Sequence, residues 1–173
     1  LIPKVTSMGW FKLMLNYELD GITISIDRSI IKKIETYCEK QPTYETGGII
    51  IGYYSSDQSS AMICDVTGAP LDSKSGRNSF FRGVKGLNKY LKNLWEEGKY
   101  YLGEWHYHPG CTSTPSAIDN QQMINISKDK NFACPEPILI IAGGKVGELN
   151  YSVSVYRNGQ RYKLSNKRDN FID

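Results

Sequence analysis

The chain has 173 residues, of which 40% are hydrophobic and 23% are charged, values typical of one globular domain with its own core. The formal net charge of +3 is too small to indicate binding to nucleic acid or to a membrane surface. No apolar run is long enough to span a bilayer, so we expect neither nucleic-acid nor membrane partners.

The four cysteines, Cys38, Cys64, Cys111 and Cys134, are widely spaced and form no Cys-x-x-Cys pair. This spacing indicates no disulfide framework and favours a reducing compartment, so we expect a cytoplasmic protein. The first fifteen residues contain an apolar patch but neither a basic leader nor a small-residue cleavage site. We therefore do not expect them to be a signal peptide.

The first third of the chain predicts a strand, a helix and a second strand. Residues 22–26 alternate and are β-branched, which is typical of a strand. Asp27 then caps a helix whose apolar residues recur at helical spacing as far as Cys38, and Pro42 ends it. The continuous apolar run at residues 48–54 predicts a strand that is covered on both faces.

The middle of the chain continues with a turn at residues 55–60 and a strand at residues 61–67. The polar residues 72–78 predict an exposed loop. Apolar residues at helical spacing from Val84 to Trp95 then predict a second helix, which Gly98 closes.

The last part of the chain is dominated by strand patterns. We predict strands at residues 100–108, 138–142, 151–157 and 160–164. A third helix is expected from Pro115 to about Lys128, followed by a loop over residues 129–137. The final two strands flank Asn158-Gly159, a strong hairpin signal. From Ser165 the chain is polar, and we expect it to fray.

These elements predict an α+β fold, with a central sheet that is mixed but mostly antiparallel and about three flanking helices. The sequence divides into an N-terminal extension at residues 1–18, one domain at residues 19–165 and a polar C-terminal tail at residues 166–173.

Both histidines of the chain, His106 and His108, stand two residues apart in the strand predicted at residues 100–108. Residues i and i+2 of a strand point to the same face, so the two imidazoles can share one metal ion. Trp105 and Tyr107 then point to the opposite face, where we expect them to pack. Pro109 ends the strand and turns the chain.

Asp119 lies about one turn into the third predicted helix, and the preceding loop is long enough to bring the helix start back against the strand end. Two histidines and one aspartate would leave the fourth position of a zinc ion free for water, as in a catalytic site. Two other interpretations stay open at this point. Ser116-x-x-Asp119 is also a variant of the capping box, and Cys111 is an alternative third ligand.

The combined pattern resembles the JAMM motif of the JAB/MPN metalloprotease family. It consists of His-x-His-Pro, six residues and Ser-x-x-Asp, preceded far upstream by Glu-Thr-Gly-Gly at the start of an apolar strand. The matching residues are Glu45, His106, His108, Pro109, Ser116 and Asp119. The resemblance covers roughly residues 20 to 160 and implies a single MPN/JAB-like domain with the layering of cytidine deaminases.

The resemblance also implies a role for each residue of the motif. His106, His108 and Asp119 would bind one zinc ion per chain, which lowers the pKa of its water to about 7. Glu45 would take the proton of that water and pass it to the leaving amine. Ser116 would donate a hydrogen bond to the developing oxyanion.

Substrates of this family typically end in an extended tail that belongs to a ubiquitin-like protein or to another conjugated protein, and a groove could bind such a tail by strand addition. Gly47 and Gly48 would let the backbone approach the site closely. Phe80, Phe81 and Arg82 are candidate groove residues, although the two phenylalanines are equally explained as core residues. The groove walls would be two loops, at residues 72–83 and 128–137.

Gly103-Glu104-Trp105-His106 and the compact size look more like the prokaryotic branch of the family, and Tyr107 departs from the small residue common in ubiquitin-cleaving members. Prokaryotic stand-alone members often accompany conjugation enzymes, including those of antiphage signalling operons. The leading hypothesis is therefore removal of a conjugated nucleotidyltransferase from its targets, a role in antiviral defence. Alternatives are a protease that trims a ubiquitin-like or sulfur-carrier precursor, and a non-catalytic interaction module.

Overall fold

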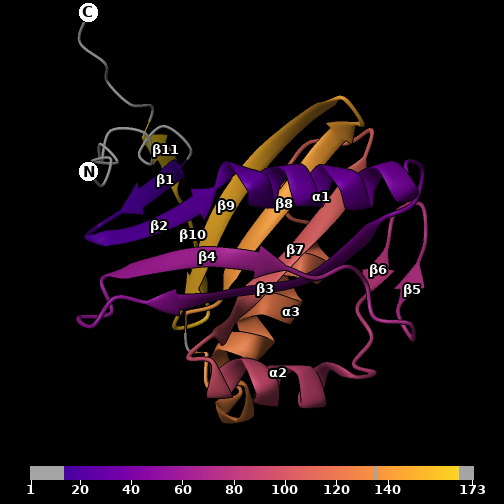
Figure 1. Ribbon diagram of the computed structural model, residues 1–173. Helices are drawn as coiled ribbons and strands as arrows, with labels where there is room; N and C mark the ends of the chain where they lie inside the picture. The colour runs from indigo at the N-terminus through magenta and orange to yellow at the C-terminus, as the bar shows by residue number, and fades with distance from the viewer. Residues whose placement is uncertain (1–13, 135, 168–173) are drawn as a thin grey trace, which may run out of the picture.

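The computed structural model describes residues 14–134 and 136–167, and most of its strands belong to one large sheet (Figure 1). The strands are β1 (Met14–Leu19), β2 (Ile22–Asp27), β3 (Thr46–Tyr54), β4 (Ser60–Val66), β5 (Lys74–Ser75), β6 (Phe80–Phe81), β7 (Tyr100–Pro109), β8 (Ile138–Lys145), β9 (Glu148–Arg157), β10 (Gln160–Lys163) and β11 (Ser165–Lys167). The large sheet has the strand order β10-β9-β8-β7-β3-β4-β2-β1-β11, and β5 pairs with β6 alone.

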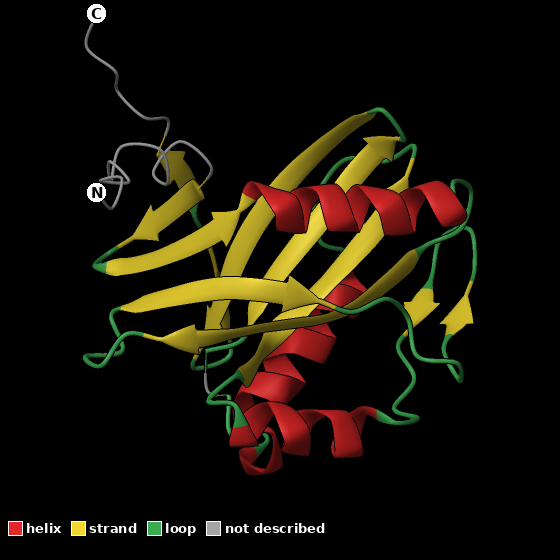
Figure 2. Cartoon of the chain, viewed as in Figure 1, coloured by secondary structure: helices red, strands yellow, loops and turns green. Residues whose placement is uncertain are grey.

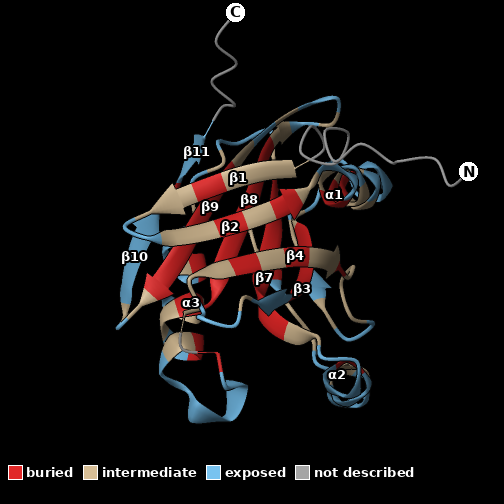
Figure 3. Ribbon diagram, turned by 60° about the vertical axis from the view of Figure 1, so that its left-hand side comes forward, coloured by how far each residue is buried: buried red, intermediate tan, exposed pale blue. Residues whose placement is uncertain are grey.

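The large sheet is mixed but mostly antiparallel, as predicted. Only the pairs β2–β4 and β7–β8 run parallel among the described strands. Strands β7 and β8 lie in the interior of the sheet, and Figure 3 shows them buried along most of their length.

Helices cover both faces of this sheet and produce three layers (Figures 1 and 2). Ile34 of α1 (Arg28–Lys40) belongs to one buried cluster together with Trp105. Leu94 of α2 (Leu87–Glu96) and Met123 of α3 (Ala117–Lys128) belong to a second cluster. The prediction of three flanking helices is therefore confirmed for the described residues, and a short 3-10 helix, η3 (Lys130–Phe132), follows α3. None of the helices in the described ranges is both long and apolar enough to cross a membrane.

Helix α1 forms where the capping residue and the apolar spacing of the sequence predict it. The side chain of Asp27 accepts a hydrogen bond from the backbone N–H of Ser29 at 2.7 Å, which satisfies one of the free donors at the helix start. One face of the helix then buries Ile30, Ile34 and Cys38, at the spacing of a helix that packs on a sheet.

The two ends of the described chain correct the sequence analysis. Residues 14–18, assigned to an N-terminal extension, belong to β1, which pairs with β2 over its whole length. Ser165 to Lys167, expected to fray, form β11 and pair with β1. β11 is the edge strand and β1 is its neighbour, and both contain polar residues such as Asn16 and Asn166, so neither has a strong apolar alternation. The rest of the predicted extension and tail lies outside the described residues.

Several element boundaries also differ from the prediction. Helix α3 begins at Ala117, because Ser116 has an extended backbone (φ −70°, ψ 171°) and serves as the N-cap, so Pro115 precedes the helix. Helix α2 begins only after Gly86, whose φ of 84° is not helical. The loop expected at residues 72–78 contains the short strand β5. Strands β8 and β9 are longer than predicted and pair with each other as a hairpin.

Candidate metal centre

Strand β7 carries both histidines on one face of the sheet. Trp105 and Tyr107 are fully buried in the cluster that includes residues of α1, as predicted. His106 and His108 point to the opposite face, where both contact Asp119 of α3, and they are only 1% and 6% exposed. The i, i+2 spacing therefore places the two imidazoles together in a buried setting.

Helix α3 brings Asp119 to the two histidines. The Oδ1 atom of Asp119 lies 2.7 Å from Nδ1 of His106, and its Oδ2 atom lies 3.3 Å from Nε2 of His108. The potential ligand atoms of the three residues all lie within 4.8 Å of one another. The sequence analysis anticipated this convergence from the strand–loop–helix order.

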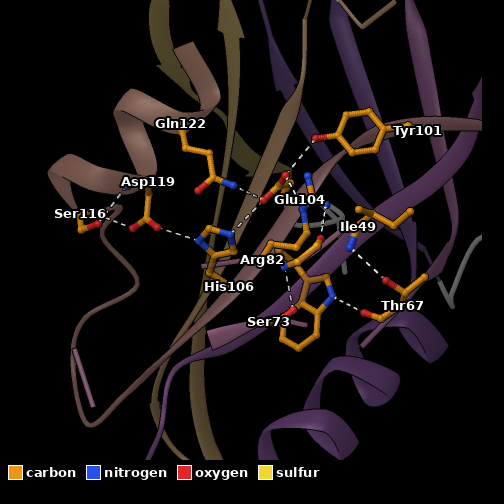
Figure 4. Close-up of polar contacts among 12 residues, drawn as sticks. Ile49, Thr67, Ser73, Arg82, Tyr101, Glu104, His106, Ser116, Asp119 and Gln122 are labelled. Atoms are coloured by element: carbon orange, nitrogen blue, oxygen red, sulfur yellow. Dashed lines mark hydrogen bonds and ion pairs between the residues drawn. The ribbon is translucent and has the colours of Figure 1, made fainter. Parts of the chain in front are cut away.

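Asp119 is at the same time part of a capping box. The Ser116 side chain accepts a hydrogen bond from the Asp119 N–H at 3.1 Å, and Oδ2 of Asp119 accepts one from the Ser116 N–H at 2.7 Å. The capping-box interpretation is thus correct, and it does not compete with the proximity to the histidines. The cap fixes the carboxylate at the helix start, facing the imidazoles (Figure 4).

The charges of the cluster favour an ionised carboxylate beside the imidazoles. Burial alone would raise the pKa of Asp119, but the hydrogen bonds with His106 and His108 hold it far below its usual value. Burial would lower the pKa of His106, whereas its contacts with Asp119 and Glu104 raise it to about 9 in the metal-free protein. The Asp119 carboxylate therefore favours a positive charge on or beside the imidazoles, which a proton supplies in the metal-free protein and a metal cation could supply in its place.

These donors fit a zinc ion. Two imidazole nitrogens and one carboxylate oxygen are the set that zinc takes in catalytic sites, where a fourth position stays free. Nδ1 of His106 and Oδ1 of Asp119 face each other at 2.7 Å, so their lone pairs repel unless a proton or a metal cation is bound between them. Cys111 is exposed and is not part of the cluster.

Glu45 lies at the start of β3, next to the end of β7 that carries the histidines. Thr46 pairs with Tyr107 and Gly47 with His106, so Glu45 stands one residue before the paired segment. Its backbone N–H donates to the Gly76 carbonyl at 2.8 Å. Burial raises the pKa of the half-buried Glu45 carboxyl, and the charges of the three clustered residues also act on it. A raised pKa makes a carboxylate a stronger proton acceptor than an exposed one.

The two glycines after Glu45 have different surroundings. A Cβ atom on Gly47 would collide with the backbone carbonyl oxygen of Trp105 and would also lie 2.8 Å from Cδ2 of His106 and 2.9 Å from Cε1 of Phe80, so another residue there would displace the β7 backbone and the side chains around the site. A Cβ atom on Gly48 would instead collide with the backbone of Thr67. Gly47 is thus the glycine that permits close approach to the metal cluster.

The predicted groove residues separate into three environments. Phe80 is buried, and its ring packs edge-on against that of His106 with centroids 5.4 Å apart. Phe81 is 55% exposed. Arg82 is directed inward, where its Nε donates to the buried Glu104 at 2.8 Å. The alternative assignment of Phe80 to the core is therefore correct for that residue alone.

A groove of about 460 Å³ runs along α3, and none of His106, His108 and Asp119 lines it. It lies between β6 and the segment around η3, so it touches both of the loops expected to form groove walls. We call it the α3 groove. It is lined by Phe81, Arg82, Ile118, Gln121, Gln122, Asn125, Ile126, Asp129 and Phe132.

The sequence analysis did not assign a role to Glu104. Its side chain is fully buried and lies 3.2 Å from Nε2 of His106 (Figure 4). The signal was present, because Glu104, His106 and His108 follow the i, i+2, i+4 spacing of one strand face.

Comparison with known proteins identifies a matching family and a similar protein. A family described as prokaryotic homologs of the JAB domain matches residues 27–156. A protein of Enterobacter hormaechei subsp. hoffmannii (strain UCI 50) named "CD-NTase/cGAS isopeptidase" is 45% identical over 138 residues, which cover 79% of this chain and 77% of that protein.

The fold also occurs in solved structures. One is the solution structure of a protein from Desulfitobacterium hafniense, which is similar with a TM-score of 0.62 at 17% sequence identity. The match covers 81% of this chain and 88% of that one, and at this identity it supports the fold alone. The family match spans most of the chain, including Glu45 and the whole metal cluster. The chain therefore belongs to the family of prokaryotic homologs of the JAB domain.

Proposed function

We propose that this protein is a zinc-dependent isopeptidase that hydrolyses the bond after the extended C-terminal tail of a conjugated protein. The observation that carries the proposal is the convergence of His106, His108 and Asp119 within 4.8 Å, beside the half-buried Glu45. The family and the 45% identical relative named as an isopeptidase support a hydrolase.

A zinc ion bound by His106, His108 and Asp119 would act as a Lewis acid and lower the pKa of a bound water. Glu45 would accept a proton from the attacking water on its carboxylate. It would then deliver this proton to the amine nitrogen as the amide bond breaks. The raised pKa of Glu45 suits both transfers, because the group must gain and lose a proton near neutral pH.

Ser116 would stabilise the negative charge that develops on the carbonyl oxygen. Its Oγ accepts the N–H of Asp119, which leaves the hydroxyl hydrogen free to donate to an incoming group. The residue is exposed at the start of α3, so substrate can reach it. Gly47 would keep the opposite wall of the site free of side chains.

The proposed substrate is a conjugated CD-NTase, in keeping with the name of the relative. Its extended tail would reach the metal cluster next to the α3 groove, where the exposed rings of Phe81 and Phe132 offer apolar contacts. We extend the proposal to antiphage deconjugation in the cytoplasm.

The test uses two substrates that share one CD-NTase, taken from the genome that encodes this chain. In one, its last residue is joined to the ε-amine of a labelled lysine peptide, and in the other to an α-amine. We expect zinc-dependent release of the label from the isopeptide substrate, loss of release with a chelator, and recovery when zinc is added back.

Glu45→Gln is the matched variant for this assay, because it removes the proton acceptor and keeps the size of the side chain. It should bind zinc and lose most of the release rate. Release at the wild-type rate by this variant would refute the assigned mechanism. Cleavage of the α-linked substrate alone would favour a processing protease, and bound zinc without turnover of either substrate would favour a non-catalytic module.

A further inference from the structure

Glu104 is a fully buried acidic residue in the central strand β7, on the face that carries His106 and His108. A buried carboxylate is costly unless several donors compensate it. A bulge precedes it, because Ile50 pairs with Gly103 and Ile51 with Tyr101, so that one residue of β7 has no partner in β3. The bulge brings Tyr101 and Glu104, three residues apart, to the same face.

Four side chains approach the Glu104 carboxylate, two at each oxygen (Figure 4). Oε1 accepts hydrogen bonds from Arg82 Nε at 2.8 Å and from the Tyr101 hydroxyl at 3.3 Å. Oε2 accepts one from Gln122 Nε2 at 2.7 Å and lies 3.2 Å from Nε2 of His106. These contacts hold the carboxylate at once from β7, from α3 and from Arg82, which directly follows β6.

The imidazole of His106 thus lies between two carboxylates. Its Nδ1 faces Asp119 at 2.7 Å, on the side of the metal cluster, and its Nε2 faces Glu104 on the other side. A carboxylate that accepts the N–H of one ring nitrogen fixes the tautomer and leaves the lone pair on the other nitrogen.

We propose that Glu104 is a positioning residue that holds the His106 ring, through Nε2, in the tautomer and orientation needed to bind metal. Arg82 and Gln122 in turn fix Glu104, so the hairpin β5–β6 and helix α3 both contribute to the geometry of one ligand. The inference rests on the proposed metal centre and not on the identity of the substrate.

The alternative is a purely structural role, in which Glu104 only pairs with the buried Arg82. This alternative predicts a loss of stability without a change in zinc binding. Two substitutions separate the roles. Glu104→Gln can still satisfy Arg82 with its amide oxygen, but it then turns its NH₂ toward His106, which favours the wrong tautomer. The double variant Glu104→Gln/Arg82→Met removes both charges, so neither is left buried without a partner.

The experiment measures zinc affinity by competition with a chromophoric chelator, together with the thermal stability of each metal-free protein. We expect Glu104→Gln to weaken zinc binding about 10- to 100-fold, the range found for such outer carboxylates. In the double variant the stability should recover relative to Arg82→Met alone, while the weak zinc binding should persist.

Nitrogen-15 NMR of the imidazoles gives an independent readout, because the chain contains only two histidines. In the zinc-loaded wild type, the Nε2 resonance of His106 should be that of a protonated nitrogen, and in Glu104→Gln it should shift. Wild-type zinc affinity in both Glu104 variants, with unchanged His106 resonances, would overturn the inference. A wild type that binds zinc tightly but cleaves neither substrate would contradict the proposed function and leave this inference intact.

Discussion

At the scale of single residues, the main feature is that Asp119 is held in place before any metal arrives. One of its oxygens accepts the Ser116 N–H, and both approach the histidines. Because the helix cap already restricts the side chain, little conformational entropy is lost when a cation binds. The same arrangement gives Ser116 two roles, as the N-cap of α3 and as the proposed oxyanion donor.

Ser116 therefore allows a test in which stability and catalysis separate. Ser116→Ala should lower the free energy of unfolding by about 1 kcal/mol, because it removes the cap, while Ser116→Gly should lower it by only a few tenths. Both variants lack the hydroxyl, so both should lose about 10²- to 10³-fold in kcat. Urea unfolding and the isopeptide assay measure the two effects. If Ser116→Gly kept nearly wild-type activity and only Ser116→Ala lost it, activity would depend on stability and not on the hydroxyl, which would contradict the oxyanion role.

The cysteines offer a second test at this scale. Burial raises the pKa of the Cys38 thiol to about 12 and that of the Cys134 thiol to about 11, so neither forms much of the reactive thiolate at pH 8. Cys111 is exposed and should be alkylated first by iodoacetamide, as mass spectrometry of peptides would show. The rate of Cys111 alkylation should not change when zinc is added. Slower alkylation in the presence of zinc would instead indicate that Cys111 is a zinc ligand.

The convergence of His106, His108 and Asp119 was predictable from the sequence, because these three candidate ligands are close in the chain and follow strand and helix spacing. Glu104 was missed, although it has the same spacing, because a charge in a strand usually marks a solvated face. The direction of Arg82 could not be predicted either. It depends on the buried Glu104, 22 residues away in the chain, and no local pattern encodes that contact.

At the scale of elements, the interior of the sheet and its β10 edge were predicted, and the opposite side, formed by β1 and β11, was not. Strands β3 and β8 are continuous apolar runs with buried side chains, which gives a strong signal. Strand β1 mixes polar and half-buried residues and gives a weak one. The start of α3 was misplaced by two residues, because Pro115 precedes a helix that Ser116 caps.

The pairing of β1 with the sheet predicts that residues 14–18 contribute to stability. Tyr17 is only 6% exposed and packs in the cluster on the α1 side. Tyr17→Ala should lower the free energy of unfolding by about 3 kcal/mol, as expected for the loss of a buried aromatic side chain. Tyr162→Ala, on the exposed strand β10, is the control and should cost much less. Equal small effects would mean that residues 14–18 behave as a dispensable extension.

Gly47 of β3 pairs with His106 of β7, and this close pairing predicts that a methyl group added at Gly47 lowers both stability and zinc affinity. In Gly47→Ala the new carbon would collide with the backbone carbonyl oxygen of Trp105, and it would lie 2.8 Å from His106 and 2.9 Å from Phe80, well inside the usual carbon–carbon separation of about 3.5–4.0 Å. We expect a loss of about 1–3 kcal/mol in stability together with weaker zinc binding. Gly147→Ala strains a turn glycine (φ 90°) in open space, and it should leave zinc affinity unchanged.

At the scale of the whole molecule, the proposed zinc ion would join segments from the middle of the sheet to α3. A ligand that binds only the folded state stabilises it, by about 2.7 kcal/mol at a concentration 100 times its dissociation constant. Zinc should therefore raise the Tm of the chelator-treated protein by several degrees, measured by differential scanning calorimetry. His108→Ala should abolish most of this rise. A rise of equal size in that variant would indicate zinc binding elsewhere.

Strand β7 lies between β3 and β8, and residues 101–108 are all buried. Its backbone amides would therefore exchange with solvent only when the whole domain unfolds, so the histidines cannot be released by opening one segment. Regulation of this enzyme would have to act elsewhere. The hairpin β5–β6 is the weaker element, since each of its strands has two residues, yet Arg82 follows it directly and the hairpin borders the α3 groove. A partner that shifts this hairpin would change substrate access and the support of Glu104 together, while the rest of the domain stays folded.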